Sequence, residues 1–323
     1  MKVTRFIVIG LLLAIPFTCL QAQQLPQYSL FTMNQLNRNP AYAGMEGSLS
    51  ITGAFRKQWT GLEGSPTTQN LTAHLPFALI GGGFGISVEN DELGAERTTS
   101  AELAYSYQLP LADGLISVGL SAGFLQRSLD GQALRTPEGE YADNVVNHND
   151  LVLPIQEVSA NTPVFGAGLY FQNEWLELGL AAENLLESSV SFSAFELLQK
   201  RTFFANAGAR LELLRALVLH PAMLVQSDLA ETQLVFSATL EYNGNIFGGA
   251  ALRGYNESSL DGVAIIAGFN LSENLKLAYA YDITISELNS VSNGSHEVMI
   301  NFNLNKDIGA GIPPPIIYNP RSL

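Results

Sequence analysis

The sequence predicts an all-β fold, a transmembrane outer-membrane β-barrel of about 14 antiparallel strands spanning residues 48–304. Three observations predict it: apolar and polar residues alternate along many segments, charged residues make up only 14% of the chain, and short linkers alternate with longer ones. Soluble domains carry roughly 25% charged residues. A helical membrane protein would show several runs of ~20 apolar residues, and the sequence shows none after its leader.

The first strand-like segment, residues 48–60, shows the alternation clearly. Ile51 and Phe55 fall on one face and Thr52 and Arg56 on the other, so one face suits lipid and the other suits water. Thirteen further segments are predicted as strands: 67–77, 79–91, 97–110, 114–128, 163–172, 174–185, 201–213, 216–228, 232–243, 245–255, 259–271, 273–285 and 294–304.

The linkers favour a barrel over a soluble β-sandwich, for which the same alternation is expected. Counted from the first strand, the even-numbered linkers are brief, as at Ala112-Asp113-Gly114, whereas the odd-numbered ones include the long stretches 129–162 and 186–200. Bacterial outer-membrane barrels have short periplasmic turns, longer outer loops and an even number of strands. The sheet must close, because each unpaired backbone group at an edge costs several kcal/mol in hydrocarbon.

Residues 1–22 are predicted to be a secretory signal peptide, since two basic residues precede a short apolar core and Ala22 suits cleavage. A lipoprotein signal ending at Cys19 is the alternative, but Pro16-Phe17-Thr18 stands where aliphatic and small residues are expected. Cys19 is the only cysteine, so the mature chain is expected to have no disulfide and no cysteine-based metal site.

Two segments flank the predicted barrel. Residues 23–47 contain Pro and Asn residues that break helix and strand patterns, and they are predicted to form an N-terminal periplasmic segment or to tuck into the barrel mouth. Residues 305–323 are predicted to be a periplasmic C-terminal tail, in which Pro313-Pro314-Pro315 favours an extended backbone.

Ten charged residues are predicted to face the lumen, because each lies on the inward face of its segment. They are Arg56, Glu102, Glu177, Glu183, Arg210, Glu212, Glu241, Lys276, Asp282 and Glu297. Both signs of charge occur. The side chains can therefore pair into a rigid network that blocks a simple pore, or stay hydrated as ordinary lumen polarity.

The sequence offers little for catalysis or metal binding. The net charge of −14 argues against a nucleic-acid partner. The acidic linker 129–162 lacks the spacing of a calcium loop, and the four histidines lack metal-ligand spacing. Ser295 and His296 are adjacent on a predicted strand, so their side chains point to opposite faces and cannot form a nucleophile and base. No enzymatic activity, cofactor or metal is predicted.

Several stretches carry a resemblance to a known family. They are NPAYAG at 39–44, FRKQWTGLEGSPTTQNLTAH at 55–74, VENDELG at 88–94, AYAYD at 278–282 and NGSHE at 293–297. The chain resembles the PorP/SprF family of outer-membrane proteins of the type IX secretion system of Bacteroidota over nearly its entire mature length. Its terminal Asn-Pro-Arg-Ser-Leu departs from the aromatic ending expected of a barrel protein.

The resemblance implies a non-enzymatic outer-membrane component that helps export or surface attachment of large secreted or gliding-adhesin proteins. The expected partners are outer-membrane lipid, type IX secretion components and a secreted surface protein or adhesin client. An outer-membrane channel or transporter for small or hydrophobic solutes is the alternative function. A barrel hydrolase is a third, and it would require catalytic groups that converge near the lipid boundary.

Overall fold

The computed structural model describes residues 25–77, 81–142, 145–192, 195–254 and 261–308. The predicted signal peptide and the tail beyond residue 308 lie outside the described residues. The strands are β1 (Ser50–Lys57), β2 (Thr67–Phe77), β3 (Gly82–Leu93), β4 (Glu96–Leu111), β5 (Gly114–Asp130), β6 (Glu157–Gln172), β7 (Leu176–Glu183), β8 (Ser189–Ser191), β9 (Glu196–Leu198), β10 (Thr202–Ala209), β11 (Leu211–Leu214), β12 (Leu217–Ser227), β13 (Thr232–Tyr242), β14 (Ile246–Arg253), β15 (Gly262–Ser272), β16 (Leu275–Thr284) and β17 (Ser295–Asn303).

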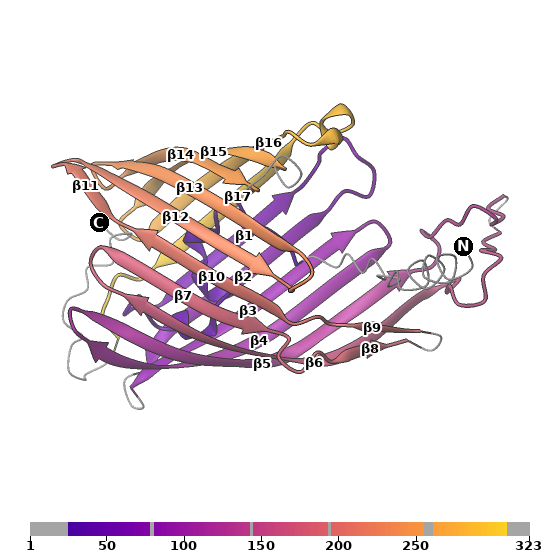
Figure 1. The fold of residues 1–323 in the computed structure, drawn as a ribbon, viewed down its shortest axis with the longest axis horizontal. Helices are drawn as coiled ribbons and strands as arrows, with labels where there is room; N and C mark the ends of the chain where they lie inside the picture. Colours follow the sequence, from indigo (N-terminus) through magenta and orange to yellow (C-terminus); the bar gives the residue numbers. More distant parts are fainter. Residues whose placement is uncertain (1–24, 78–80, 143–144, 193–194, 255–260, 309–323) are drawn as a thin grey trace, which may run out of the picture.

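One antiparallel sheet closes into a barrel (Figure 1). Its first strand, β1, pairs with both β2 and the last strand, β17. β11 follows β10 after Arg210, and both strands pair with β12. The two therefore form one barrel strand with an interruption at Arg210. Counted this way, the 15-stranded sheet is a 14-strand barrel. The predicted fold class is confirmed. None of the described helices is both long and apolar enough to cross a membrane.

Side chains alternate across the barrel wall as the period of two requires. In β1, Thr52 and Arg56 are buried inside, whereas the ring of Phe55 is 46% exposed on the outside. Leu103 on β4 and Leu120 on β5 also lie on the outer face and are among its most exposed side chains. The outer surface of the barrel is therefore apolar and its inner surface is largely polar.

The strands follow the predicted segments closely, with two differences at the long connections. β6 begins at Glu157, well before the expected residue 163, and pairs with the extended end of β5. The predicted linker 186–200 contains the hairpin β8–β9. Val190 and Phe192 of this hairpin pack on Leu125 and Val164, so the hairpin and the ends of β5 and β6 share a small apolar core.

The connections differ in length at the two ends of the barrel. Residues 112–113, 173–175, 215–216, 243–245 and 273–274 connect strands at one end, here called the short-turn end. The other end, here called the long-loop end, carries residues 131–156, 184–201 and 285–294. This arrangement is typical of bacterial outer-membrane barrels, in which the short turns are periplasmic.

Residues 25–47, here called the plug, lie inside the barrel (Figure 1). The plug contains three short 3-10 helices, η1 (Phe31–Met33), η2 (Gln35–Asn37) and η3 (Pro40–Tyr42). Another 3-10 helix of the described residues, η5 (Glu287–Ser290), lies between β16 and β17. Leu30 and Phe31 pack among small inward residues such as Ala278 and Ala280, and Met299. The sequence left both a periplasmic position and a position in the barrel mouth open for residues 23–47, and the described part of this segment lies within the barrel.

Candidate functional site in the barrel lumen

Arg56 lies at the centre of a buried ion cluster in the half of the lumen nearer the long loops. Arg56 stands directly opposite Glu297 in the β1–β17 ladder, which puts both side chains on the inner face. Its Nη1 donates to Glu297 Oε2 at 2.8 Å, and its Nη2 donates to Asp282 Oδ2 at 2.5 Å. Arg56 and Glu297 are 0% exposed. Because burial removes both charges from water, each depends on its partner.

The plug completes this cluster. The backbone N–H groups of Ser29 and Leu30 donate to the two carboxylate oxygens of Glu297, at 2.8 and 3.0 Å. Ser29 Oγ donates to Asp282 Oδ1 at 2.8 Å and accepts from Arg253 Nη2 at 2.9 Å. Arg253 Nη2 also lies 3.2 Å from Asp282 Oδ2. Charge-assisted hydrogen bonds of this kind are roughly twice as strong as neutral ones, so the cluster fastens the plug to the wall.

A second set of polar contacts joins the plug to β2 and β3. Tyr28 Oη donates to Glu89 Oε2 at 2.8 Å, and Asn37 Nδ2 donates to the same oxygen at 3.1 Å. Asn34 Nδ2 donates to Asn70 Oδ1 at 2.8 Å. These bonds satisfy side chains that the plug would otherwise bury without partners.

The Asn39 to Gly44 motif is the part of the plug that docks on the wall nearer the short-turn end. Asn39 Oδ1 accepts from the Ala41 backbone N–H at 3.0 Å and caps η3. Asn39 Nδ2 donates to the Leu169 carbonyl at 3.0 Å and to the Leu180 carbonyl at 3.3 Å. One side chain therefore both starts the turn and ties it to β6 and β7.

Glycines in the wall allow this close approach. A Cβ atom on Gly119 would lie 2.2 Å from the Ala41 nitrogen, and one on Gly83 would lie 2.4 Å from the Ala43 oxygen. Gly44 has a φ of +72°, and a Cβ atom there would lie 2.7 Å from Gly83 Cα. Any side chain at these wall positions would push the plug away from the strands.

Replacing Asn39 with alanine is expected to lower the free energy of unfolding by about 1–2 kcal/mol, because the cap and two side-chain hydrogen bonds are lost. Urea unfolding of the detergent-solubilised protein measures this change, and tryptic cleavage after Arg38 reports whether the plug loosens. Asn274→Ala is the matched control, since Asn274 Nδ2 also donates to two backbone carbonyls, those of Asn303 and Leu304, and neither belongs to the plug. Equal cleavage in both variants would contradict the prediction.

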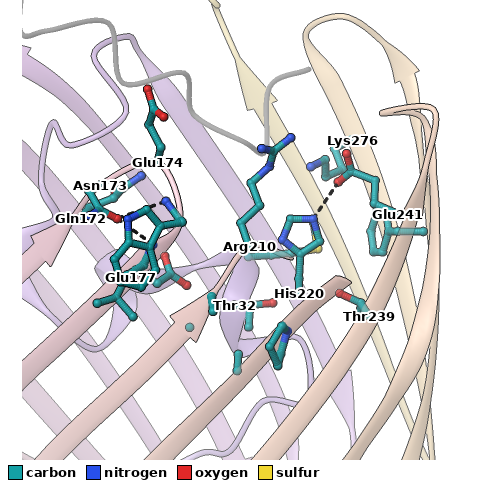
Figure 2. Close-up of a pocket in the computed structure, with 18 residues that line it drawn as sticks. Thr32, Gln172, Asn173, Glu174, Glu177, Arg210, His220, Thr239, Glu241 and Lys276 are labelled. Atoms are coloured by element: carbon teal, nitrogen blue, oxygen red, sulfur yellow. Dashed lines mark hydrogen bonds and ion pairs between the residues drawn. The ribbon is translucent and has the colours of Figure 1, made fainter. Parts of the chain in front are cut away.

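A small cavity of about 90 Å³ opens at the short-turn end between the plug and β6 to β16 (Figure 2). Figure 2 shows His220 and Glu241 facing one another, with His220 Nε2 3.5 Å from Glu241 Oε2. Arg210 and Lys276 also line the cavity, and Glu177 accepts a hydrogen bond from Tyr170 outside it. A volume of this size corresponds to about three water molecules, so the cavity suits water or one side chain.

A wider recess of about 540 Å³ lies beside this cavity and shares Met33 and Lys276 with it. Asparagines dominate its polar lining: Asn245, Asn270, Asn274, Asn301, Asn303 and Asn305. At the short-turn end the plug packs against β3 to β6, and the recess, here called the vestibule, lies between the plug and β15 to β17.

The structure separates the ten predicted lumen residues into several groups. Arg56, Asp282 and Glu297 meet in the ion cluster, and Glu177, Arg210, Glu241 and Lys276 line the short-turn cavity. Glu102 and Glu183 line a small cavity beside plug residue Arg38, where Glu102 accepts from Ser121 Oγ at 2.8 Å. Glu212 pairs with Arg210 at 2.7 Å near the rim, and its side chain is 68% exposed.

Several charged residues of the lumen were missing from the prediction, among them Glu89 and Arg253. In β3, Ile86 and Val88 point outward, so the period of two places Glu89 on the inner face. Its position in the lumen could therefore have been predicted from the alternation. Arg253 ends β14, whose Gly248-Gly249-Ala250-Ala251 run gives no clear alternation. The hydrogen bonds from Ser29 to the carboxylates of Glu297 and Asp282 could not be predicted from the sequence, because they depend on where the plug lies.

Ser295 and His296 point to opposite sides of the wall. Ser295 is 2% exposed, and its Oγ accepts from the Trp59 backbone N–H at 3.1 Å. His296 Nδ1 lies 2.6 Å from Tyr279 Oη. The two side chains therefore do not meet as a nucleophile and a base. Within the described residues, no group of three or more His, Cys, Asp and Glu side chains is placed to hold a metal ion.

A closed barrel with an apolar exterior, short turns at one end and a polar lumen defines an outer-membrane β-barrel protein. In this one, a segment of the chain itself occupies the lumen. The chain belongs to the PorP/SprF family: the model for the type IX secretion system membrane protein PorP/SprF matches residues 20–302. The predicted family and the predicted outer-membrane location are confirmed.

Solved structures share the barrel architecture at low sequence identity. Omp33 of Acinetobacter baumannii is 8% identical with a TM-score of 0.45, and the match covers 80% of this chain and 99% of that one. The CymD monoaromatic hydrocarbon channel is 13% identical with a TM-score of 0.49, and the match covers 86% of this chain and 93% of that one. No curated protein sequence matches the chain.

Proposed function

We propose that this chain is a non-enzymatic accessory of type IX secretion that helps export or surface attachment of large secreted or gliding-adhesin proteins. Its family membership supports an association with the secretion machinery. The finer role rests on one observation, that the plug is fastened inside the barrel by buried ion pairs and by close packing against wall glycines.

A filled lumen favours protein recognition over solute passage. The plug meets both the long-loop half of the wall, through Ser29, and the short-turn half, through Asn39. The surfaces left for partners are the long loops, the short turns and the vestibule beside Lys276. The apolar outer face contacts membrane lipid and fixes the position of these surfaces in the bilayer.

Deletion of the gene tests this function. The expected result is that at least one large type IX-dependent protein disappears from the cell surface, measured by mass spectrometry of surface and medium fractions. Loss of one adhesin with other exports intact would indicate a dedicated helper, and general export failure would indicate a core component. Surface and medium fractions identical to those of the parent strain would refute the proposal.

A further inference from the structure

The described residues of the loop between β5 and β6, 131–142 and 145–156, fold around a polar centre. Tyr141 Oη accepts from the Thr136 backbone N–H at 2.7 Å and lies 3.0 Å from His148 Nδ1. Thr136 Oγ1 donates to the His148 carbonyl at 2.6 Å, and His148 Nε2 lies 3.0 Å from the Pro154 oxygen. His148 is 2% exposed. These hydrogen bonds fix the described part of the loop in one shape, which lowers the conformational entropy that it would lose on binding.

This folded loop turns aliphatic side chains outward. Leu151 is fully exposed, and Val152 and Ile155 are 48% and 55% exposed. These three residues lie on the last part of the loop before β6, and we use the name loop tip for them. The loop projects beyond the long-loop end of the barrel (Figure 1). Exposed aliphatic groups close together in the sequence of a pre-shaped loop are typical of interaction sites, because water contact with them is unfavourable.

The charges around the loop tip indicate the chemistry of its partner. Asp150, Glu138 and Glu140 are exposed. The basic residue Arg135 is engaged within the loop, where it lies 4.7 Å from the centre of the Tyr141 ring and donates to two backbone carbonyls. The loop is therefore acidic around an apolar tip. Such a surface repels anionic lipid headgroups and a second copy of itself, and attracts a basic surface.

We propose that the loop tip is a docking site for the secreted surface protein, and that its partner surface is an apolar pocket bordered by Lys and Arg side chains. This inference rests on the proposed function and assigns the long-loop end to client retention. The aliphatic side chains supply the buried contact, and the carboxylates set orientation and partner choice.

The double variant Leu151→Asp and Ile155→Asp tests the loop tip in living cells. Export should continue, but the client should move from the cell surface to the medium, with retention at least about tenfold weaker as expected for loss of a hot spot. Leu229→Asp is the control, since Leu229 is also exposed, on the β12–β13 loop. Unchanged retention in the double variant, or equal release by the control, would overturn the inference.

Comparison with the gene deletion separates the two proposals. If deletion changes the surface proteins and the double variant does not, only the loop-tip inference fails. If deletion itself has no effect, the proposed function fails as well.

A cross-linking experiment tests the chemistry of the partner. Cys19 lies in the predicted leader, so Leu151→Cys gives the mature protein a single thiol. A thiol-to-amine cross-linker applied to whole cells should join this thiol to the client released in the double variant. Charge reversal by Glu138→Arg and Asp150→Arg, which adds no reactive amine, should reduce the yield severalfold. Three results would overturn the inference. The thiol could be joined to a second copy of the chain, it could be joined to membrane lipid amines alone, or the yield could stay unchanged after charge reversal.

Discussion

Replacing Arg56 with methionine is expected to destabilise the protein by about 3–5 kcal/mol, because buried carboxylates lose their closest cation. Among the described residues, Glu297 would keep the N–H groups of Ser29 and Leu30, and Asp282 would keep Arg253 and Ser29. We expect the plug to leave the long-loop half of the lumen first. A lower urea midpoint in detergent and faster tryptic cleavage after Arg38 would measure the two effects.

Arg97→Met provides the matched control for this prediction. Arg97 Nε lies 3.0 Å from Glu92 Oε1, but the two side chains are 56% and 47% exposed. An exposed ion pair contributes about 0–1 kcal/mol, so this variant should unfold nearly as the parent does. Similar midpoints for Arg56→Met and the parent protein would show that the buried cluster does not hold the plug.

Replacing Gly119 with leucine is expected to open the lumen. The new side chain would enter the space of the Ala41 backbone, since even a Cβ atom would lie 2.2 Å from its nitrogen. The backbone of β5 can keep its ladder, whereas the plug must move away. In planar bilayers, the parent protein should show little steady current and the variant a large one, because a 14-strand barrel without its plug has an aqueous interior.

Gly53→Leu is the control for this experiment, because nothing lies within 4 Å of a Cβ atom built on Gly53. Its bilayer current should match that of the parent protein. Large currents through the parent would instead favour the channel function that the sequence left as an alternative. An unchanged current in Gly119→Leu would show that the plug is not the barrier.

Much of the barrel was predictable from local patterns. In β4, Leu103 and Tyr105 alternate with Glu102 and Ala104, and such a strand has only one arrangement that keeps charge away from lipid. The short turns also predicted which strands are neighbours in the sheet, because antiparallel strands can be joined by a few residues. The early start of β6 was missed because Glu157, Ser159 and Asn161 give it a polar outward face beyond the membrane, where no lipid imposes the pattern.

The lumen was predictable only as a set of inward-facing residues. Arg56 and Asp282 are 226 positions apart, and their contact requires the last strands to return beside the first. The plug sequence shows no regular period of apolar residues. Its conformation is set by local hydrogen bonds, in short 3-10 turns and in the cap that Asn39 makes, so it presents no single repeating face.

The sequence by itself determined the barrel, since the alternation of side chains is fixed residue by residue along the chain. Only the tertiary structure decided that the barrel is filled and which charges meet, because ring closure and the path of residues 25–47 bring together groups that no local pattern relates. Wall glycines and buried carboxylates acquire their roles only when the plug lies against them.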